Sequence, residues 1–202
     1  MSLNYADFQV IPESQRRRSR RVRVNSQDQI ILQIFEKVAG DDGVIDAFEL
    51  QTLLQTCFRR ELGEYKFNLE TCRSLLLLYD TDGSFCVEFD EFNKLWRDLK
   101  AWYGIFKKYD TDKSFDMNRR ELNRALHEVS DFPVTQKTID IYAKRFANKN
   151  DNIDLDDFLQ IIARTKCLTR SFERQVSRSG SVERNPRVKF SLEAYLQACL
   201  LA

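Results

Sequence analysis

Apolar residues recur at helical spacing through most of this chain, beginning near residue 30. The first run contains Ile31, Ile34, Phe35 and Val38, and intervals of three or four residues place these side chains on one face of a helix. The polar segment "AGDDGVID", residues 39–46, then interrupts the pattern, which resumes at Phe48. This stretch therefore predicts a helix, a loop and a second helix.

The same helix-loop-helix unit recurs along the chain, which indicates an internal repeat. Polar loops follow at residues 80–91 and 110–121, then at "ANKNDNIDLDDF", and a basic loop follows "SFERQ" near the end. The segment between the loops at 80–91 and 110–121 keeps one apolar face, so one long helix is expected to serve both loops. The pattern predicts an all-α fold of five such units, with short β-pairings between the loops.

We expect two parts along the chain, a basic flexible tail or linker over residues 1–27 and one folded domain over residues 28–202. The expected units within the domain are residues 28–60, 70–98, 100–128, 137–165 and 168–202. Only 6 Gly and 3 Pro occur in 202 residues, which favours long helices over a chain of strands and turns.

Composition excludes several classes of protein. The formal net charge of +1 gives no indication of nucleic-acid binding. Five cysteines without CxxC spacing suggest neither a disulfide framework nor a zinc site, and favour a reducing, cytoplasmic location. No apolar run is long enough to span a membrane, and the first residues lack the apolar stretch of a signal peptide.

Positive charge is concentrated near the start of the chain. The arginines of this run are Arg16, Arg17, Arg18, Arg20, Arg21 and Arg23. Such a run attracts anionic lipid by about 1 kcal/mol per residue close to a membrane surface. The run favours a solvated linker arm over this membrane contact, and both readings stay open.

Two of the loops carry oxygen donors at alternate positions, as a twelve-residue calcium loop requires. Calcium takes roughly six to eight oxygen ligands, with a closing glutamate that supplies two of them. The expected ligands of the loop at 80–91 are Asp80, Asp82, Ser84, the carbonyl of Cys86, and Glu91. Those of the loop at 110–121 are Asp110, Asp112, Ser114, the carbonyl of Asp116, and Glu121. A polar turn with a helix cap would explain one such loop, but two copies between apolar helices favour calcium.

Both loops depart from the usual pattern at the sixth place, where glycine is expected. Phe85 and Phe115 stand there instead. The turn normally needs a positive φ, which costs a residue with a Cβ about 1–2 kcal/mol and would weaken calcium affinity roughly ten-fold. Val87 and Met117 occupy the eighth place, where paired loops are expected to bond as a short two-stranded sheet.

The order of the five units resembles the penta-EF-hand family, and within it the C-terminal calcium-binding domain of calpains. The resemblance covers about residues 28–202. It is carried by "AGDDGVIDAFELQTLL", "TCRSLLLLYDTDGS", "KAWYGIFKKYDTDKS", "RFANKNDNIDLDDF" and "LEAYLQACL". In this family the first loop has eleven residues and binds calcium through two backbone carbonyls, one carboxylate and a closing glutamate. The resemblance implies as its ligands Ala39 and Val44, through their carbonyls, together with Asp42 and Glu49.

The last two loops are weaker candidates for metal binding. The fourth loop begins at Phe146, carries Asn148 and Asn150, and closes with Asp157, whose shorter side chain chelates less readily than glutamate. The fifth loop contains only basic charged residues and Glu183, with no aspartate. In the family the unpaired fifth unit docks against its counterpart in a second chain. The resemblance therefore implies a homodimer or heterodimer formed through residues 168–202.

An enzymatic role is not expected for this chain. Calpains are calcium-dependent cysteine proteases, but their chemistry lies in a separate region. The one histidine here, His127, sits in a helical stretch, and no cysteine lies in a nucleophile signature. Two hypotheses follow: a calcium-binding regulatory module that dimerises, either alone or as part or subunit of a calpain, and a calcium-independent scaffold with degenerate loops.

Overall fold

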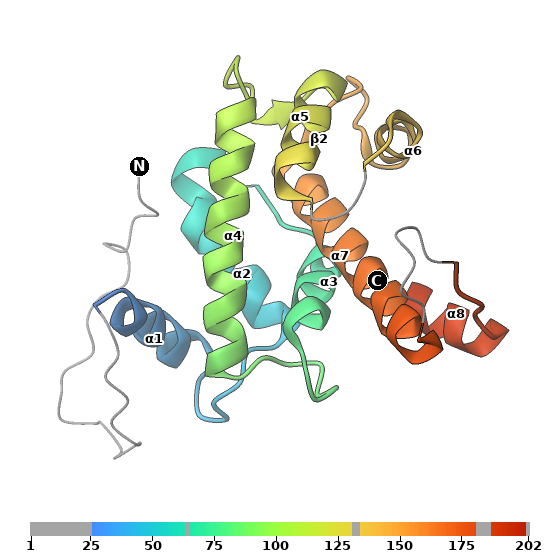
Figure 1. Cartoon of the computed structure of the whole chain (residues 1–202). Coiled ribbons are helices and arrows are strands. Elements are labelled where there is room, and N and C mark those ends of the chain that lie inside the picture. The colour runs from blue at the N-terminus through green and yellow to red at the C-terminus, as the bar shows by residue number, and fades with distance from the viewer. Residues whose placement is uncertain (1–25, 64, 131–133, 181–186, 201–202) are drawn as a thin grey trace.

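The computed structural model describes residues 26–63, 65–130, 134–180 and 187–200. The arginine run at residues 16–23 therefore lies outside the described residues, as does most of the expected tail. In the described part, the structure contains eight helices and two short strands (Figure 1). Their bounds are α1 Ser26–Val38, α2 Ala47–Leu62, α3 Leu69–Tyr79, α4 Phe89–Tyr109, β1 Asp116–Met117, α5 Arg119–Val129, α6 Gln136–Phe146, β2 Ile153–Asp154, α7 Leu155–Ser179 and α8 Leu192–Leu200.

The helices that leave the first three loops begin with the same hydrogen-bonded cap. The backbone N–H of Asp46 donates to the carboxylate of Glu49 at the start of α2. Glu88 and Glu91 are related in the same way at the start of α4. In each case the glutamate carboxylate accepts a hydrogen bond from the backbone N–H of the residue that precedes the helix. That N–H has no hydrogen-bond partner within the helix itself. The closing glutamate of each loop therefore also fixes where the next helix begins.

The loops pair two by two through backbone hydrogen bonds. Ile45 and Val87 exchange two backbone hydrogen bonds of 3.0 Å, which joins the first loop to the second. Strand β1 pairs antiparallel with β2, with Met117 opposite Ile153, and this joins the third loop to the fourth. The prediction that Val87 and Met117 each bond to a paired loop is confirmed, since Val87 pairs with Ile45 and Met117 with Ile153. In the described residues the fifth unit forms no strand.

One long helix serves the second and third loops, as the apolar pattern predicted. Helix α4 runs for 21 residues, with the second loop before its start and the third loop after its end; Figure 1 shows it as the long green helix. Trp96, Leu99 and Phe106 on this helix are buried in the core. Because α4 is continuous and one of its faces is buried, the two loops lie at its opposite ends.

Helix α7 is likewise shared, between the fourth and fifth units. It is continuous over 25 residues and ends at Gly180, whose φ of 67° terminates the helix in the left-handed conformation. It packs mainly against α3, and Arg170 donates a hydrogen bond to the carbonyl oxygen of Leu78. Leu78 lies two residues before Asp80, so α7 supports the entrance to the second loop.

None of the helices in the described residues combines the length and apolar character needed to cross a lipid bilayer.

Candidate calcium-binding loops

The second loop is folded around the side chain of its first residue. Asp80 accepts hydrogen bonds at Oδ1 from the backbone N–H of Gly83 (2.8 Å) and Ser84 (3.2 Å), and at Oδ2 from that of Phe85 (2.9 Å). Asp82 accepts at 3.0 Å from the same Ser84 N–H. The chain is thereby wound so that the carboxylates at the first and third places face one another across a single turn.

The third loop repeats this arrangement. Asp110 accepts from the N–H of Ser114 at 3.0 Å and from that of Phe115 at 3.2 Å, and Asp112 accepts from Ser114 at 3.0 Å. Thirty residues apart, the two loops thus adopt the same set of side-chain to backbone bonds. The repeat seen in the sequence is also a repeat of local structure, since short carboxylate side chains favour such turns.

The closing glutamates are buried and held at both oxygens. Glu91 Oε1 accepts from the Thr81 hydroxyl at 2.6 Å and from the Thr81 N–H at 2.9 Å, while Oε2 accepts from the Glu88 N–H at 3.2 Å. Glu121 makes the matching contacts, with the hydroxyl of Thr111 2.7 Å from Oε1. The side chains of Thr81 and Thr111 therefore position the residue expected to supply two calcium ligands.

These threonines were not among the residues singled out from the sequence. Both occupy the second place of a "DTD" segment, so the repeat itself was a signal that could have drawn attention to them. What the sequence could not supply was the direction of the glutamate side chain, because it closes the loop from ten residues away.

The aromatic residues at the sixth place adopt the backbone conformation that the loop demands. Phe85 and Phe115 both have a φ of 62°, a left-handed conformation that is costly for a residue with a Cβ. Their side chains are exposed, Phe85 to 64% and Phe115 to 42%. The rings therefore recover little of the backbone cost through burial.

The first loop is built with two glycines at positive φ, Gly40 at 58° and Gly43 at 76°. Asp42 accepts from the N–H of Val44 at 3.2 Å, and Ala39 is buried at the end of α1. Glu49 closes the loop as the capping residue of α2. Of the four residues implied by the resemblance, Ala39, Asp42 and Val44 lie between α1 and α2, and Glu49 lies in the first turn of α2.

In the fourth loop, an asparagine side chain accepts the backbone hydrogen bonds that aspartates accept in the second and third loops. Asn148 Oδ1 accepts from the backbone N–H of Asn150 at 2.8 Å and of Asn152 at 3.2 Å. Asp157, the closing residue, lies in the first turn of α7, where its N–H donates to Asp154. Burial raises the pKa of Asp157 to about 6, with a further contribution from the charge of Asp154. At the expected ligand places this loop therefore offers two neutral amides and one short carboxylate, fewer carboxylates than the second and third loops.

Electrostatics differ within each of the two repeated loops. Hydrogen bonds from Ser84 lower the pKa of Asp82, and those from Ser114 lower the pKa of Asp112. Burial raises the pKa of Asp110. Burial also raises the pKa of the Cys86 thiol, followed by the negative charges of Asp46 and others in the first loop. Serine hydrogen bonds therefore favour the ionised form of the aspartate at the third place of both loops.

The donor set of the second and third loops suits calcium in its chemistry. It consists of carboxylate, hydroxyl and carbonyl oxygens, which are the ligands of a hard cation. In the ranges that the structure describes, no three side chains of His, Cys, Asp or Glu gather closely enough to hold a metal ion. Binding through these loops would therefore depend on the serine and carbonyl oxygens as well as on carboxylates.

The amino-acid sequence of this chain is similar to those of sorcin and calpain small subunit 1. No protein-family model matches it. Sorcin from Mus musculus is 36% identical over 167 residues, which are 82% of this chain and 80% of that protein. Calpain small subunit 1 from Rattus norvegicus is 30% identical over 166 residues, which are 81% of this chain and 59% of that protein. The chain thus spans less than two thirds of the calpain small subunit.

A solved structure shows the same fold. A homologue of programmed cell death 6 protein from Leishmania major Friedlin superimposes with a TM-score of 0.59 at 21% identity, covering 88% of this chain and 97% of that one. Sorcin and the calpain small subunit are non-catalytic penta-EF-hand proteins, which agrees with the expectation that this stretch of chain contains no catalytic domain. Five helix-loop-helix units were also expected, and the identity to sorcin extends over most of both proteins. The chain belongs to the penta-EF-hand family.

Proposed function

We propose that this chain is a calcium-binding regulatory module of calpain type, which senses calcium through its first three loops and dimerises through its fifth unit. The observation that carries the proposal is the matched geometry of the second and third loops. In each, paired aspartates and a buried closing glutamate are held by the same hydrogen bonds.

Isothermal titration calorimetry tests the calcium proposal directly. The full chain, stripped with a chelator, is expected to bind calcium at two or more sites below about 1 mM, within the range of known EF-hand sites. Glu91→Gln combined with Glu121→Gln should abolish the second and third sites, because an amide cannot chelate with two anionic oxygens. A matched control is Glu128→Gln, which changes an exposed glutamate on α5 that bonds Lys108. Calcium heats that survive the double substitution unchanged would contradict the assignment.

A calcium-independent scaffold is the second candidate function. It is favoured by the left-handed Phe85 and Phe115, and by protein donors that already occupy both oxygens of Glu91 and Glu121. A wild-type chain without any heat of binding at millimolar calcium would support the scaffold and rule out the sensor.

Dimerisation through residues 168–202 is supported by the apolar surface of the last two helices. Leu192, Tyr195 and Leu196 on α8 are exposed, Leu192 to 74%. Phe172 on α7 is also exposed. The other loops pair within the chain, whereas the described part of the fifth unit has no strand partner, which leaves an apolar face for a second chain. Sedimentation equilibrium with and without calcium measures the association.

Location and membrane contact complete the proposal. A cytoplasmic location follows from the reduced, scattered cysteines. Contact of Arg16–Arg23 with anionic membranes rests on charge alone. Liposome binding that is unchanged after deletion of residues 16–23 would eliminate that contact.

A further inference from the structure

The carboxylate of Asp116 connects the third loop to the fourth. Asp116 occupies the seventh place, where only its backbone carbonyl is an expected calcium ligand. Its side chain nevertheless makes specific contacts: Oδ1 accepts from the hydroxyl of Ser114 at 2.9 Å and from the Nδ2 of Asn152 at 2.9 Å. Oδ2 lies 3.5 Å from the Nδ2 of Asn148. A side chain that is not itself a ligand therefore touches one that is.

The hydroxyl of Ser114 has one proton and two acceptors within reach. The carboxylate of Asp116 lies 2.9 Å away and the carbonyl oxygen of Asp116 lies 3.1 Å away. A hydrogen bond to an ionised acceptor is stronger than one to a neutral carbonyl, so the carboxylate takes the proton. Both the hydroxyl lone pairs of Ser114 and the carbonyl oxygen of Asp116 are then left for a cation.

The second loop lacks this device and provides an internal comparison. Cys86 stands at its seventh place, without a carboxylate. The hydroxyl of Ser84 is 3.2 Å from the carbonyl oxygen of Cys86, which is an expected ligand. In this loop the serine proton is thus directed at an oxygen that calcium would have to share or displace.

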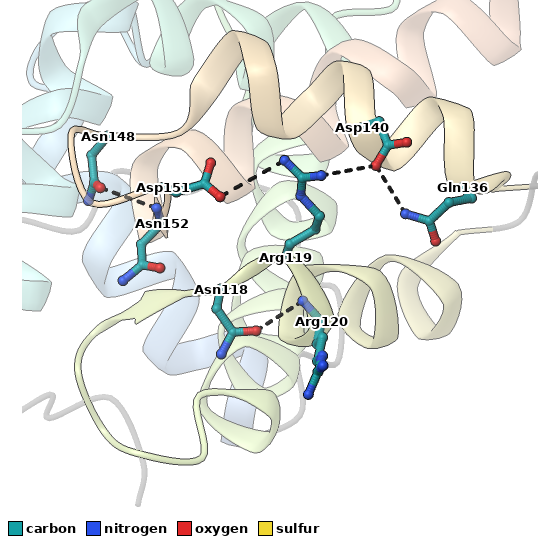
Figure 2. A network of polar contacts seen from close by, with 8 residues as sticks. All are labelled: Asn118, Arg119, Arg120, Gln136, Asp140, Asn148, Asp151 and Asn152. Atoms are coloured by element: carbon teal, nitrogen blue, oxygen red, sulfur yellow. Dashed lines mark hydrogen bonds and ion pairs between the residues drawn. The ribbon is translucent and has the colours of Figure 1, made fainter.

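The fourth loop is held in the position from which its amides reach Asp116. Pairing of β1 with β2 places Asp116 opposite Asp154. Arg119, at the start of α5, lies between Asp140 of α6 (3.4 Å) and Asp151 of the fourth loop (3.9 Å), as Figure 2 shows. In the same view Asn148 bonds the backbone of its own loop. The fourth loop is therefore held beside the third by strand pairing and by the exposed ion pairs of Arg119.

We propose that the Asp116 carboxylate positions the Ser114 hydroxyl for cation binding in the third loop, and that Asn148 and Asn152 of the fourth loop hold that carboxylate in place. Outer-shell partners of this kind typically change metal affinity about 10- to 100-fold. The third loop consequently binds calcium more tightly than the second. The inference rests on the proposed function, because it concerns the strength of the same calcium site.

The test measures calcium binding to full-length chains by calorimetry, in a Glu91→Gln parent in which the second loop is silenced. Asp116→Ala should weaken the third site by about ten-fold, the lower end of outer-shell effects. Asn152→Ala should weaken it less, because Asn148 still reaches the carboxylate. Glu128→Gln, which changes an exposed glutamate of α5 that bonds Lys108 outside the loops, is the control and should leave the affinity unchanged.

A Ser114→Ala background separates positioning from simple charge. If the carboxylate acts through the hydroxyl, Asp116→Ala added to Ser114→Ala should cause little further loss. An equal ten-fold loss in that background would overturn the proposal, since the carboxylate would then act by attraction alone. Asp116→Asn retains an acceptor oxygen without the charge and should lose less affinity than Asp116→Ala; equal losses would likewise count against positioning.

The outcomes also distinguish this inference from the proposed function. If the wild-type chain binds calcium and Asp116→Ala binds it equally well, only the role of Asp116 is wrong. If the wild-type chain binds no calcium at all, the proposed function and the role of Asp116 fall together.

Discussion

Phe85 offers a direct measurement of the strain in a calcium loop whose sixth residue has a Cβ. Its φ of 62° lies in the left-handed region, and its side chain is 64% exposed. Phe85→Gly should therefore stabilise the folded chain, because glycine adopts this conformation without steric cost. The proper reference is Phe85→Ala, which removes the ring but keeps the Cβ that causes the strain.

The magnitude follows from two opposing contributions. Left-handed backbone costs a residue with a Cβ about 1–2 kcal/mol, and glycine recovers this amount in the folded state. Glycine also gains conformational freedom in the unfolded chain, which costs about 0.5–1 kcal/mol relative to alanine. Loss of the ring is common to both variants and cancels. The Phe85→Gly variant should thus have a free energy of unfolding about 0.5–1 kcal/mol higher than that of the Phe85→Ala variant. At this chain length the difference corresponds to about 1–4 °C in Tm.

Urea denaturation in the presence of a chelator measures this difference without a contribution from calcium. Phe115 gives a second, independent pair of variants at the same φ, and the same difference between glycine and alanine should appear there. A glycine variant equal to or less stable than its alanine counterpart at both positions would refute the reasoning, because relief of the left-handed strain would then be too small to measure.

Three further predictions concern the body of the fold. Burial raises the pKa of Asp156 to about 7, whereas the carboxyl in the unfolded chain has a pKa of about 3.9. The carboxyl of the unfolded chain loses its proton at lower pH than that of the folded chain, so the free energy of unfolding falls as pH rises from about 4 to about 7. By urea denaturation, Asp156→Asn should be about 1–3 kcal/mol more stable than the wild type at pH 8 and equally stable at pH 4. A difference that does not change with pH would contradict this. Arg170→Ala removes the hydrogen bond to the Leu78 carbonyl at the end of α3 and should cost about 0.5–1.5 kcal/mol by the same assay, against Arg174→Ala on the same helix as control. Leu196→Glu should convert the proposed dimer to a monomer in sedimentation equilibrium, and an unchanged mass would exclude α8 from the interface.

Local sequence was sufficient for the elements and for the general form of the loops. Val87 and Met117, at the eighth place of their loops, were each predicted to bond to a neighbouring loop, and each does so. The positive φ expected at the sixth place is present at Phe85 and Phe115. These features could be predicted because each depends on residues within one twelve-residue loop, where spacing along the chain fixes which backbone groups meet.

Contacts between distant segments were not predictable in the same way. The amide of Asn152 reaches Asp116 across 36 residues, and Arg170 reaches Leu78 across 92. Neither pair carries a signature in the sequence, since an asparagine in a polar loop and an arginine on a helix are ordinary residues. Their partners are chosen by how the helices pack.

The sequence by itself determined the repeated unit, the spacing of oxygen-bearing residues along the loops and the all-α fold, because periodicity and spacing act locally. Only the tertiary structure decided that α7 packs along α3, that threonines hold the closing glutamates, and that the fourth loop holds a side chain of the third. The physical reason is that the direction of a side chain, and the neighbour it finds, are fixed by packing between segments that the sequence separates.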